Sequence, residues 1–176
     1  MTRVVAFLRG INLPRRNRIS MPDLRRLLTT AGFLDVRTYL NSGNVLLATS
    51  APPREVAEAL ERVIDAELGL DVRVVVRTQS ELQAVARANP LAGVAINPKR
   101  YQVAFFSESV PSDLEPRLSA ATADSERFVI LGREVYAWLP ESVERSRLWA
   151  LLAGPRLGGV ATLRNWTSVE TLVTLL

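Results

Sequence analysis

Short apolar segments and amphipathic helical segments follow one another in a fixed order along the first half of the chain. The apolar residues 3–8 precede a helical pattern that opens with the cap sequence of residues 20–23. Two further apolar segments come next, and the polar residues 41–44 between them favour a tight turn, because Asn and Gly accept positive φ angles easily. A second helical pattern ends at Gly69, and a Val-rich segment at residues 71–77 follows. This order of strand, helix, strand, strand, helix and strand predicts a ferredoxin-like arrangement.

The second half of the chain repeats the order without detectable sequence identity to the first half. Strands are predicted at residues 101–106, 128–131, 134–139 and 160–163, and helices at residues 112–121 and 145–152. A capping pattern at Thr167 and Glu170 predicts a terminal helix, and the same pattern at residues 78–81 predicts a helix after the first half. The predicted fold class is therefore α+β, a tandem duplication of ferredoxin-like β-α-β-β-α-β subdomains with additional helices. We expect an N-terminal subdomain with its following helix over residues 1–90, and a C-terminal subdomain with the terminal helix over residues 98–176.

The absence of both cysteine and histidine from the 176 residues excludes several kinds of site. Disulfides, cysteine nucleophiles, Cys/His metal sites and histidine general bases are all impossible. We therefore predict no metal site and no cofactor, and acid–base chemistry would have to use Asp, Glu, Tyr, Lys or solvent. No apolar run is long enough to cross a membrane and no signal-peptide core is present, so we expect a soluble cytoplasmic protein.

The positive charge of the chain permits an anionic partner. The net charge is +4, the pI is about 10.3, and Lys99 is the single lysine, so the charge comes almost entirely from arginine. Arginine spread along a chain is also typical of a solvated surface or of codon composition. We expect nucleic-acid binding to be weak and non-specific, and we expect no membrane binding.

The predicted topology places two polar segments at the same end of the first sheet. The first and second strands run the same way, so the loop after the first strand lies beside the turn between the second and third. We call these two segments, residues 9–18 and 41–44, the rim. The predicted ligand-binding residues are Arg9, Gly10, Asn12, Arg16, Asn17, Ser42, Gly43 and Asn44, with Arg15 as a further cation. A cationic, amide-rich rim without carboxylates at a helix N-terminus suits a phosphate, so the expected partner is a small anionic, phosphorylated or nucleotide-like molecule.

A structural interpretation of the rim stays open beside this one. The side chains of Asn12, Asn41 and Asn44 can hydrogen-bond to the loop backbone, while Gly10 and Gly43 turn the chain. Under that interpretation the polar residues build the loops and bind nothing.

A group of short motifs resembles one bacterial family, the domain of unknown function 1697. The motifs are residues 8–12, Asn17, Met21, Leu24, residues 32–33, 38–39, 42–44, 89–90 and 164–166. The resemblance runs nearly from end to end and implies two ferredoxin-like subdomains without a settled activity. Members of the family usually carry a Gly–Gly pair where Pro14 and Arg15 stand, often followed by a lysine in place of Arg16. Pro14 removes a backbone donor from a possible phosphate cradle, and arginine side chains are the substitutes as anion ligands.

A secondary candidate site comprises Arg164, Asn165 and Trp166. Here Arg164 would bind an anion and Trp166 would offer a stacking face, whereas the alternative is a helix cap with Trp166 packed under the last helix. Rival functions are nucleic-acid binding on a sheet surface, an assembly role, and an enzyme that uses Asp23 or Tyr39 as its base. No carboxylate pair with recognisable spacing supports a hydrolase.

Overall fold

The chain divides into two compact units in the computed structural model, which describes residues 1–13 and 16–176. The first unit comprises Met1–Gln83 with Leu172–Leu176, and the second comprises Ala84–Thr171. The division falls inside two helices, α3 (Gln79–Ala88) and α6 (Trp166–Leu175). The expectations for Pro14 and Arg15 lie outside the described residues.

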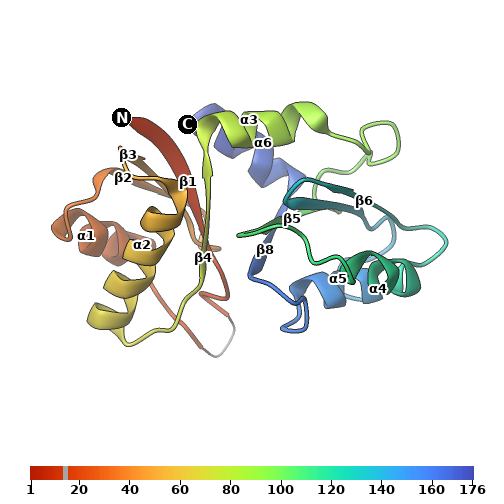
Figure 1. Ribbon diagram of the computed structural model, residues 1–176, viewed down its shortest axis with the longest axis horizontal. Helices are drawn as coiled ribbons and strands as arrows, with labels where there is room; N and C mark the ends of the chain where they lie inside the picture. The colour runs from red at the N-terminus through yellow and green to blue at the C-terminus, as the bar shows by residue number, and fades with distance from the viewer. Residues whose placement is uncertain (14–15) are drawn as a thin grey trace. The chain divides into compact units, whose positions relative to one another are not determined.

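The first unit has the ferredoxin-like topology that the order of patterns predicts (Figure 1). Its elements are β1 (Thr2–Leu8), α1 (Met21–Thr30), β2 (Leu34–Tyr39), β3 (Asn44–Thr49), α2 (Pro53–Leu68) and β4 (Val74–Thr78). The sheet order is β2-β3-β1-β4, and each pair of neighbours is antiparallel. At the end of β1, Phe7 pairs with Asn44 of β3 and Leu8 pairs with Val74 of β4.

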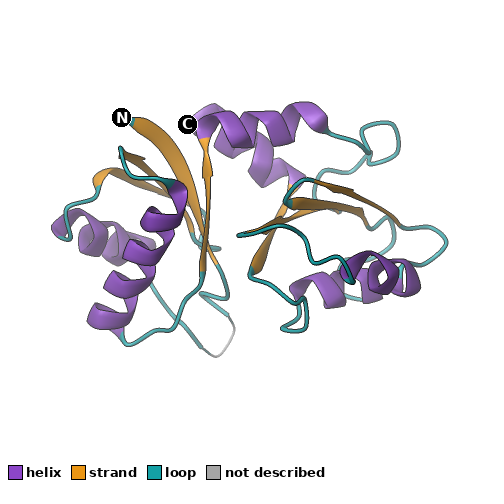
Figure 2. Cartoon of the chain, viewed as in Figure 1, coloured by secondary structure: helices purple, strands orange, loops and turns teal. Residues whose placement is uncertain are grey.

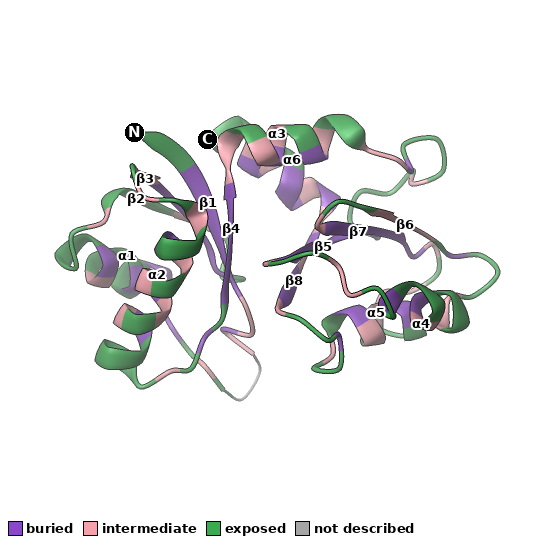
Figure 3. Cartoon of the chain, in the orientation of Figure 1, coloured by how far each residue is buried: buried purple, intermediate pink, exposed green. Residues whose placement is uncertain are grey.

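Helices α1 and α2 cover one face of this sheet (Figure 2). Successive side chains of a strand point to opposite faces, so alternate residues of β1 join the core beneath the helices. The core includes Val4, Ala6 and Leu8 from β1, Leu24 and Leu28 from α1, and Leu60 and Ile64 from α2. Val5 and Phe7, on the opposite face of β1, are also fully buried, and burial extends along most of β1 and β4 (Figure 3).

The second unit repeats the topology, which confirms the predicted duplication of the fold. Its elements are β5 (Tyr101–Phe106), α4 (Leu114–Ala121), β6 (Arg127–Leu131), β7 (Glu134–Trp138), α5 (Arg147–Ala153) and β8 (Ala161–Asn165). The sheet order is β6-β7-β5-β8, which matches the first sheet position for position. Ala104 and Phe106 of β5 pack with Leu118 of α4 and with Leu148 and Leu152 of α5.

Three predicted helix caps hold, and one is wrong. Ser20 caps α1 by accepting from the Asp23 amide at 3.1 Å, and Thr78 and Glu81 exchange two hydrogen bonds at the start of α3. Gly69 ends α2 at a φ of 64°, as a glycine stop should. Thr167, however, does not cap the terminal helix: the helix begins at Trp166, and the Asn165 Oδ1 accepts from the Ser168 amide at 2.9 Å in its place.

Several element boundaries also differ from the sequence prediction, among them those of α5 and β4. Helix α5 begins at Arg147 because Ser146 is its cap and accepts from the Trp149 amide at 3.0 Å. Strand β4 begins at Val74, three residues later than predicted, although the Arg73 carbonyl still accepts from the Arg9 amide at 2.8 Å. Among the described residues, no helix combines the length and the apolar character that crossing a membrane requires.

The closing residues 172–176 of the first unit lie next to its first strand. Arg3 Nη1 donates to the Leu176 carbonyl at 3.4 Å. The first unit is therefore built from two stretches of chain that are far apart in sequence.

Position 43, in the turn between β2 and β3, requires a glycine for its backbone angle and for the space around it. Its φ is +82°, and an added Cβ would lie 2.8 Å from Leu8 Cβ and 2.7 Å from Ile11 Cδ1. Gly69 also has a positive φ, but no atom lies within 4 Å of its added Cβ.

We expect Gly43→Ala to lower the free energy of unfolding more than Gly69→Ala does. Both changes add about 1–3 kcal/mol of backbone strain, and the overlap at Gly43 adds about 1–3 kcal/mol more. Urea denaturation of the two variants measures the difference. Equal losses would show that Leu8 and Ile11 move aside without cost.

Candidate functional site

Two hydrogen bonds to backbone carbonyls bring the two segments of the rim together at one end of the first sheet. The Leu8 amide donates to the Gly43 carbonyl at 2.8 Å, which ties the end of β1 to the β2–β3 turn. The Asn12 Nδ2 donates to the Asn41 carbonyl, also at 2.8 Å. The loop after β1 and the turn therefore lie side by side, as the predicted strand order requires.

Asn12 organises the loop of the rim through three hydrogen bonds of its side chain. Its Oδ1 accepts from the Ile19 amide at 2.8 Å, and its Nδ2 donates to the Ile19 carbonyl at 2.9 Å as well as to Asn41. Its φ of 51° is a left-handed conformation that Asn tolerates better than most residues. Both polar atoms of the Asn12 side chain are thus hydrogen-bonded to backbone groups of Ile19 and Asn41.

Asn17 closes the same loop from its other side. Its carbonyl accepts from the Asn12 amide at 2.7 Å, its Nδ2 donates to the Gly10 carbonyl at 2.9 Å, and its φ is 53°. Gly10 is also left-handed, with a φ of 69°. Residues 10–13 and 16–19 are therefore cross-linked by their own asparagines.

Asn44 is fully buried, and its side-chain amide forms hydrogen bonds within the β2–β3 turn. Its Nδ2 donates to the Tyr39 carbonyl at 2.8 Å and to Ser42 Oγ at 3.1 Å. Ser42 is exposed, whereas Gly43 is buried. The structural interpretation of the asparagines thus describes their hydrogen bonds well.

The two rim segments carry no carboxylate, as expected from the sequence, but two acidic residues lie on the elements that flank them. Asp23 lies in the first turn of α1, bonded to Ser20 and paired with Arg26 at 2.7 Å, so this helix N-terminus already has an acidic group. Glu61 of α2 accepts from the Val74 amide at 2.8 Å and lies 3.4 Å from Arg73 Nε. The sequence pattern missed Glu61 because α2 contributes it from outside the two rim segments.

Arginines supply the positive charge of the rim. Arg16 and Arg18 are exposed and Arg9 is partly buried, and a short bridge between Leu13 and Arg16 sets the backbone of the loop. Arg16 has no ion pair with any residue within 1–13 and 16–176. The loop thus presents guanidinium groups on a backbone that its asparagines hold in place.

The secondary candidate residues belong to the second unit and are largely buried there. Arg164 is 6% exposed and donates from Nη1 to Thr162 Oγ1 at 2.8 Å and to the Leu163 carbonyl at 2.7 Å. Burial lowers the pKa of Arg164 to about 9, so its guanidinium still carries a charge at neutral pH.

Trp166 packs inside the second unit, as the alternative interpretation of this motif has it. Its ring stacks on Tyr101 with a centroid separation of 4.8 Å, and its Nε1 donates to Glu170 Oε1 at 2.9 Å. Burial raises the pKa of Tyr101 to about 12. Together with Asn165 as a helix cap, this motif has a structural role for each of its three residues.

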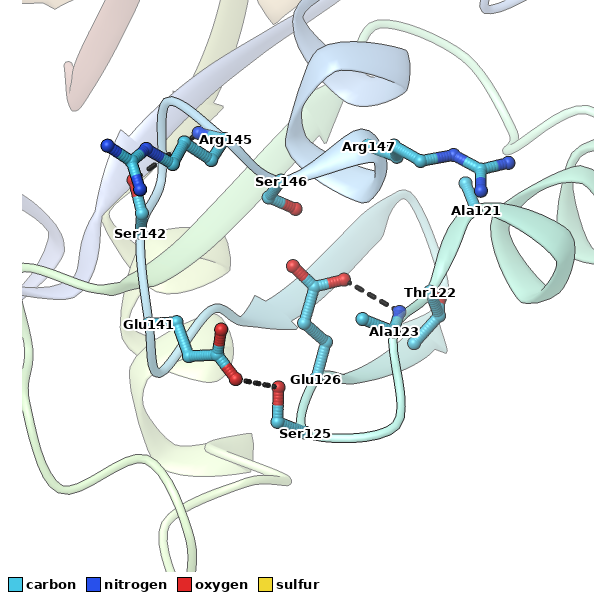
Figure 4. Close-up of a pocket in the computed structure, with 10 residues that line it drawn as sticks. All are labelled: Ala121, Thr122, Ala123, Ser125, Glu126, Glu141, Ser142, Arg145, Ser146 and Arg147. Atoms are coloured by element: carbon cyan, nitrogen blue, oxygen red, sulfur yellow. Dashed lines mark hydrogen bonds between the residues drawn. The ribbon is translucent and has the colours of Figure 1, made fainter.

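A cavity of about 280 Å³ in the second unit was not predicted from the sequence (Figure 4). Its lining comes from two segments, one at and after the end of α4 and one before and at the start of α5, with the residues Ala121, Thr122, Ala123, Ser125, Glu126, Glu141, Ser142, Arg145, Ser146 and Arg147. The two segments lie about 20 residues apart, and neither carries a recognisable motif on its own. Within the part of the chain that the structure describes, no cluster of acidic side chains has the make-up of a metal site.

We expect Asn44→Ala to lower the free energy of unfolding by about 1–3 kcal/mol, because Asn44 is fully buried and the part-buried Tyr39 carbonyl loses its partner. Ser42→Ala, which removes only the more exposed partner of the same amide, is the matched control. Urea denaturation compares the two. An unfolding free energy unchanged by Asn44→Ala would show that the amide does not hold the turn.

Comparisons with known proteins agree with this architecture. The profile of the family described as "Protein of unknown function (DUF1697)" matches residues 1–136. A solved structure, the conserved bacterial protein SP0830 from Streptococcus pneumoniae, is similar with a TM-score of 0.80 and 21% identity over 99% of this chain and 98% of that one. No curated protein sequence matches the chain. The chain therefore belongs to the DUF1697 family of proteins of unknown function.

Proposed function

We propose that the first unit binds a small anionic, phosphate-bearing molecule at the rim. The observation that carries the proposal is the set of asparagine hydrogen bonds that cross-link residues 10–13 and 16–19, the segments that carry Arg16 and Arg18. Arg9 precedes the loop, and its amide is anchored to the Arg73 carbonyl. Three guanidinium groups on one anchored loop are the kind of donor set that recognises a phosphate.

A fixed loop matters because binding orders flexible side chains at a cost in entropy. Each rotamer-rich side chain that a ligand immobilises costs about 0.5–1.5 kcal/mol. The asparagine hydrogen bonds order the loop backbone beforehand, so that only the arginine side chains have to be ordered by the ligand. In this proposal Asn12, Asn17 and Asn44 position the site, with Gly10, Ser42 and Gly43 shaping its backbone, and the arginines contact the anion.

Arg9→Ala combined with Arg16→Ala should abolish binding of pyrophosphate and ADP, because two of the proposed guanidinium ligands are lost. A ligand that binds only the folded protein raises its melting temperature, with a stabilisation of about 2.7 kcal/mol at one hundred times its Kd. Thermal unfolding with and without each compound therefore measures the loss.

The matched control is Arg26→Ala combined with Arg54→Ala, which removes the same charge from helix surfaces of the first unit. This control should retain the ligand-induced shift in melting temperature. If both double variants respond to pyrophosphate and ADP like the unaltered protein, or if the unaltered protein responds to neither compound, the rim is not an anion site.

A weak interaction with nucleic acid is the second candidate. Sheet-surface binding to RNA needs exposed aromatic rings, but Phe7, Phe105 and Phe106 are each no more than 1% exposed. Dispersed arginines, by contrast, contact phosphates without reading bases.

We expect binding to DNA and RNA oligonucleotides to be weak, to show no sequence preference, and to weaken steeply with salt. Each phosphate contact contributes about one to the slope of log affinity against log salt. Fluorescence anisotropy between low and physiological salt measures that slope. A tight complex that survives high salt would instead require a specific nucleic-acid site.

A further inference from the structure

Strand β6 forms one edge of the second sheet, and within residues 1–13 and 16–176 no strand pairs with its outer side (Figure 1). Four of its five residues are apolar, and its only charged residue, Arg127, stands at its first position. Each residue of β6 is at least partly exposed, whereas all five residues of the neighbouring β7 are buried (Figure 3). An apolar edge of this kind is a template for pairing with a further strand.

The equivalent edge of the first sheet, β2, has two protective features that β6 lacks. Its pairing with β3 is irregular between Leu34 and Arg37, and Asp35 in this stretch has a φ of 52°. Asp35 and Arg37 also place charges within the strand. Bulges and charged side chains are common means of preventing an edge strand from pairing further. The pairing of β6 with β7, by contrast, runs without a break from Arg127 to Leu131.

The hydrogen bonds between β5 and β7 show which way the backbone groups of β7 point. The Phe106 amide donates to the Arg133 carbonyl at 2.9 Å, and the Leu139 amide donates to the Arg100 carbonyl at 3.2 Å. Hydrogen-bonding sides alternate along an antiparallel strand. The odd-numbered residues in and next to β7 therefore direct their backbone groups toward β5, and the even-numbered ones toward β6.

Phe128 and Ile130 of β6 therefore direct their amides and carbonyls away from the sheet. The even-numbered residues of β7 pair with Arg127, Val129 and Leu131, and the two residues between these face outward. In the described part of the chain, none of these four outward groups has a hydrogen-bond partner. Donors and acceptors that alternate along an extended strand are matched by the backbone of one more strand.

The sequence of β6 suits an antiparallel partner of the same sequence. With Val129 opposite Val129 of the other copy, Phe128 of each strand lies opposite Ile130 of the other, and the outward groups are all hydrogen-bonded. An aromatic side chain beside a β-branched one is a favourable cross-strand pair. The two Arg127 residues stand at opposite ends of the pair, about 14 Å apart along the strands, so like charges do not face each other.

We propose that two copies of the chain associate by antiparallel pairing of their β6 strands, with Val129 on the two-fold axis. The interface is isologous, since the same strand serves on both sides. A second copy fits better than an unrelated extended peptide, because the register that matches the outward backbone groups also places apolar side chains opposite one another. The surface is separate from the rim, which belongs to the first unit.

Sedimentation equilibrium of the full chain should show a reversible monomer–dimer equilibrium between about 10 μM and about 1 mM, the range of a weak association. Over the same range, hydrogen exchange of the Phe128 and Ile130 amides should slow as the dimer forms. The amides of Arg127, Val129 and Leu131 already face β7, so their exchange should respond much less to concentration.

Val129→Lys and Val129→Asp should each weaken dimerisation by at least about tenfold, because like charges then lie directly opposite each other. An equimolar mixture of the two variants should dimerise again, since the introduced charges are opposite in sign. Leu34→Lys is the matched control, because it places the same charge at an exposed position of the edge strand of the first sheet. This control should dimerise like the unaltered protein.

Four results would each overturn the proposal. They are a chain that stays monomeric up to about 1 mM, unchanged dimerisation in a folded Val129→Lys variant, no dimer in the mixture of the two folded variants, and an equal loss of the dimer in Leu34→Lys. If a Val129 variant does not fold, hydrogen exchange of the unaltered chain decides. Exchange of the Phe128 and Ile130 amides that is independent of protein concentration contradicts the pairing.

Discussion

Strand β1 is the constraint on which the first unit depends, because it is hydrogen-bonded on both sides and apolar on both faces. Its pairing with β3 and β4 fixes the sheet order, and its alternate side chains place the core beneath α1 and α2. Hydrogen bonds continue this pairing at the last residue of β1 and one residue beyond it, where the Leu8 amide donates to the Gly43 carbonyl and the Arg9 amide donates to the Arg73 carbonyl. The geometry of the rim is therefore a continuation of the sheet.

The polar residues of the rim divide into two groups with different physical roles. The asparagines have left-handed backbone angles or buried amides, and their side chains satisfy backbone groups that a tight loop would otherwise leave without partners. The arginines carry charge at the surface of that loop. A motif of asparagine and glycine followed by arginines can thus combine a structural need with a binding role, and substitution of each group separates the two.

The order and spacing of apolar residues were enough to predict the fold, and helix caps such as Ser20 and Thr78 fixed several boundaries. The meeting of the two rim segments followed from the strand order alone. The direction of the Asn44 amide could not be predicted, because a turn and a ligand site favour the same residues. The hydrogen bond of Glu61 to the Val74 amide and the cavity of the second unit could not be predicted from the sequence either. Both depend on packing between segments that carry no motif.

The discontinuous make-up of the first unit bears on the order in which the chain can fold during synthesis. Its last segment, Leu172–Leu176, follows the whole of the second unit in sequence. Domains generally fold as units while the chain emerges from the ribosome, with the N-terminal one first. Here all four strands of the first sheet lie within residues 2–78 and are synthesised first, whereas the contact between Arg3 and Leu176 forms only after the second unit has been made.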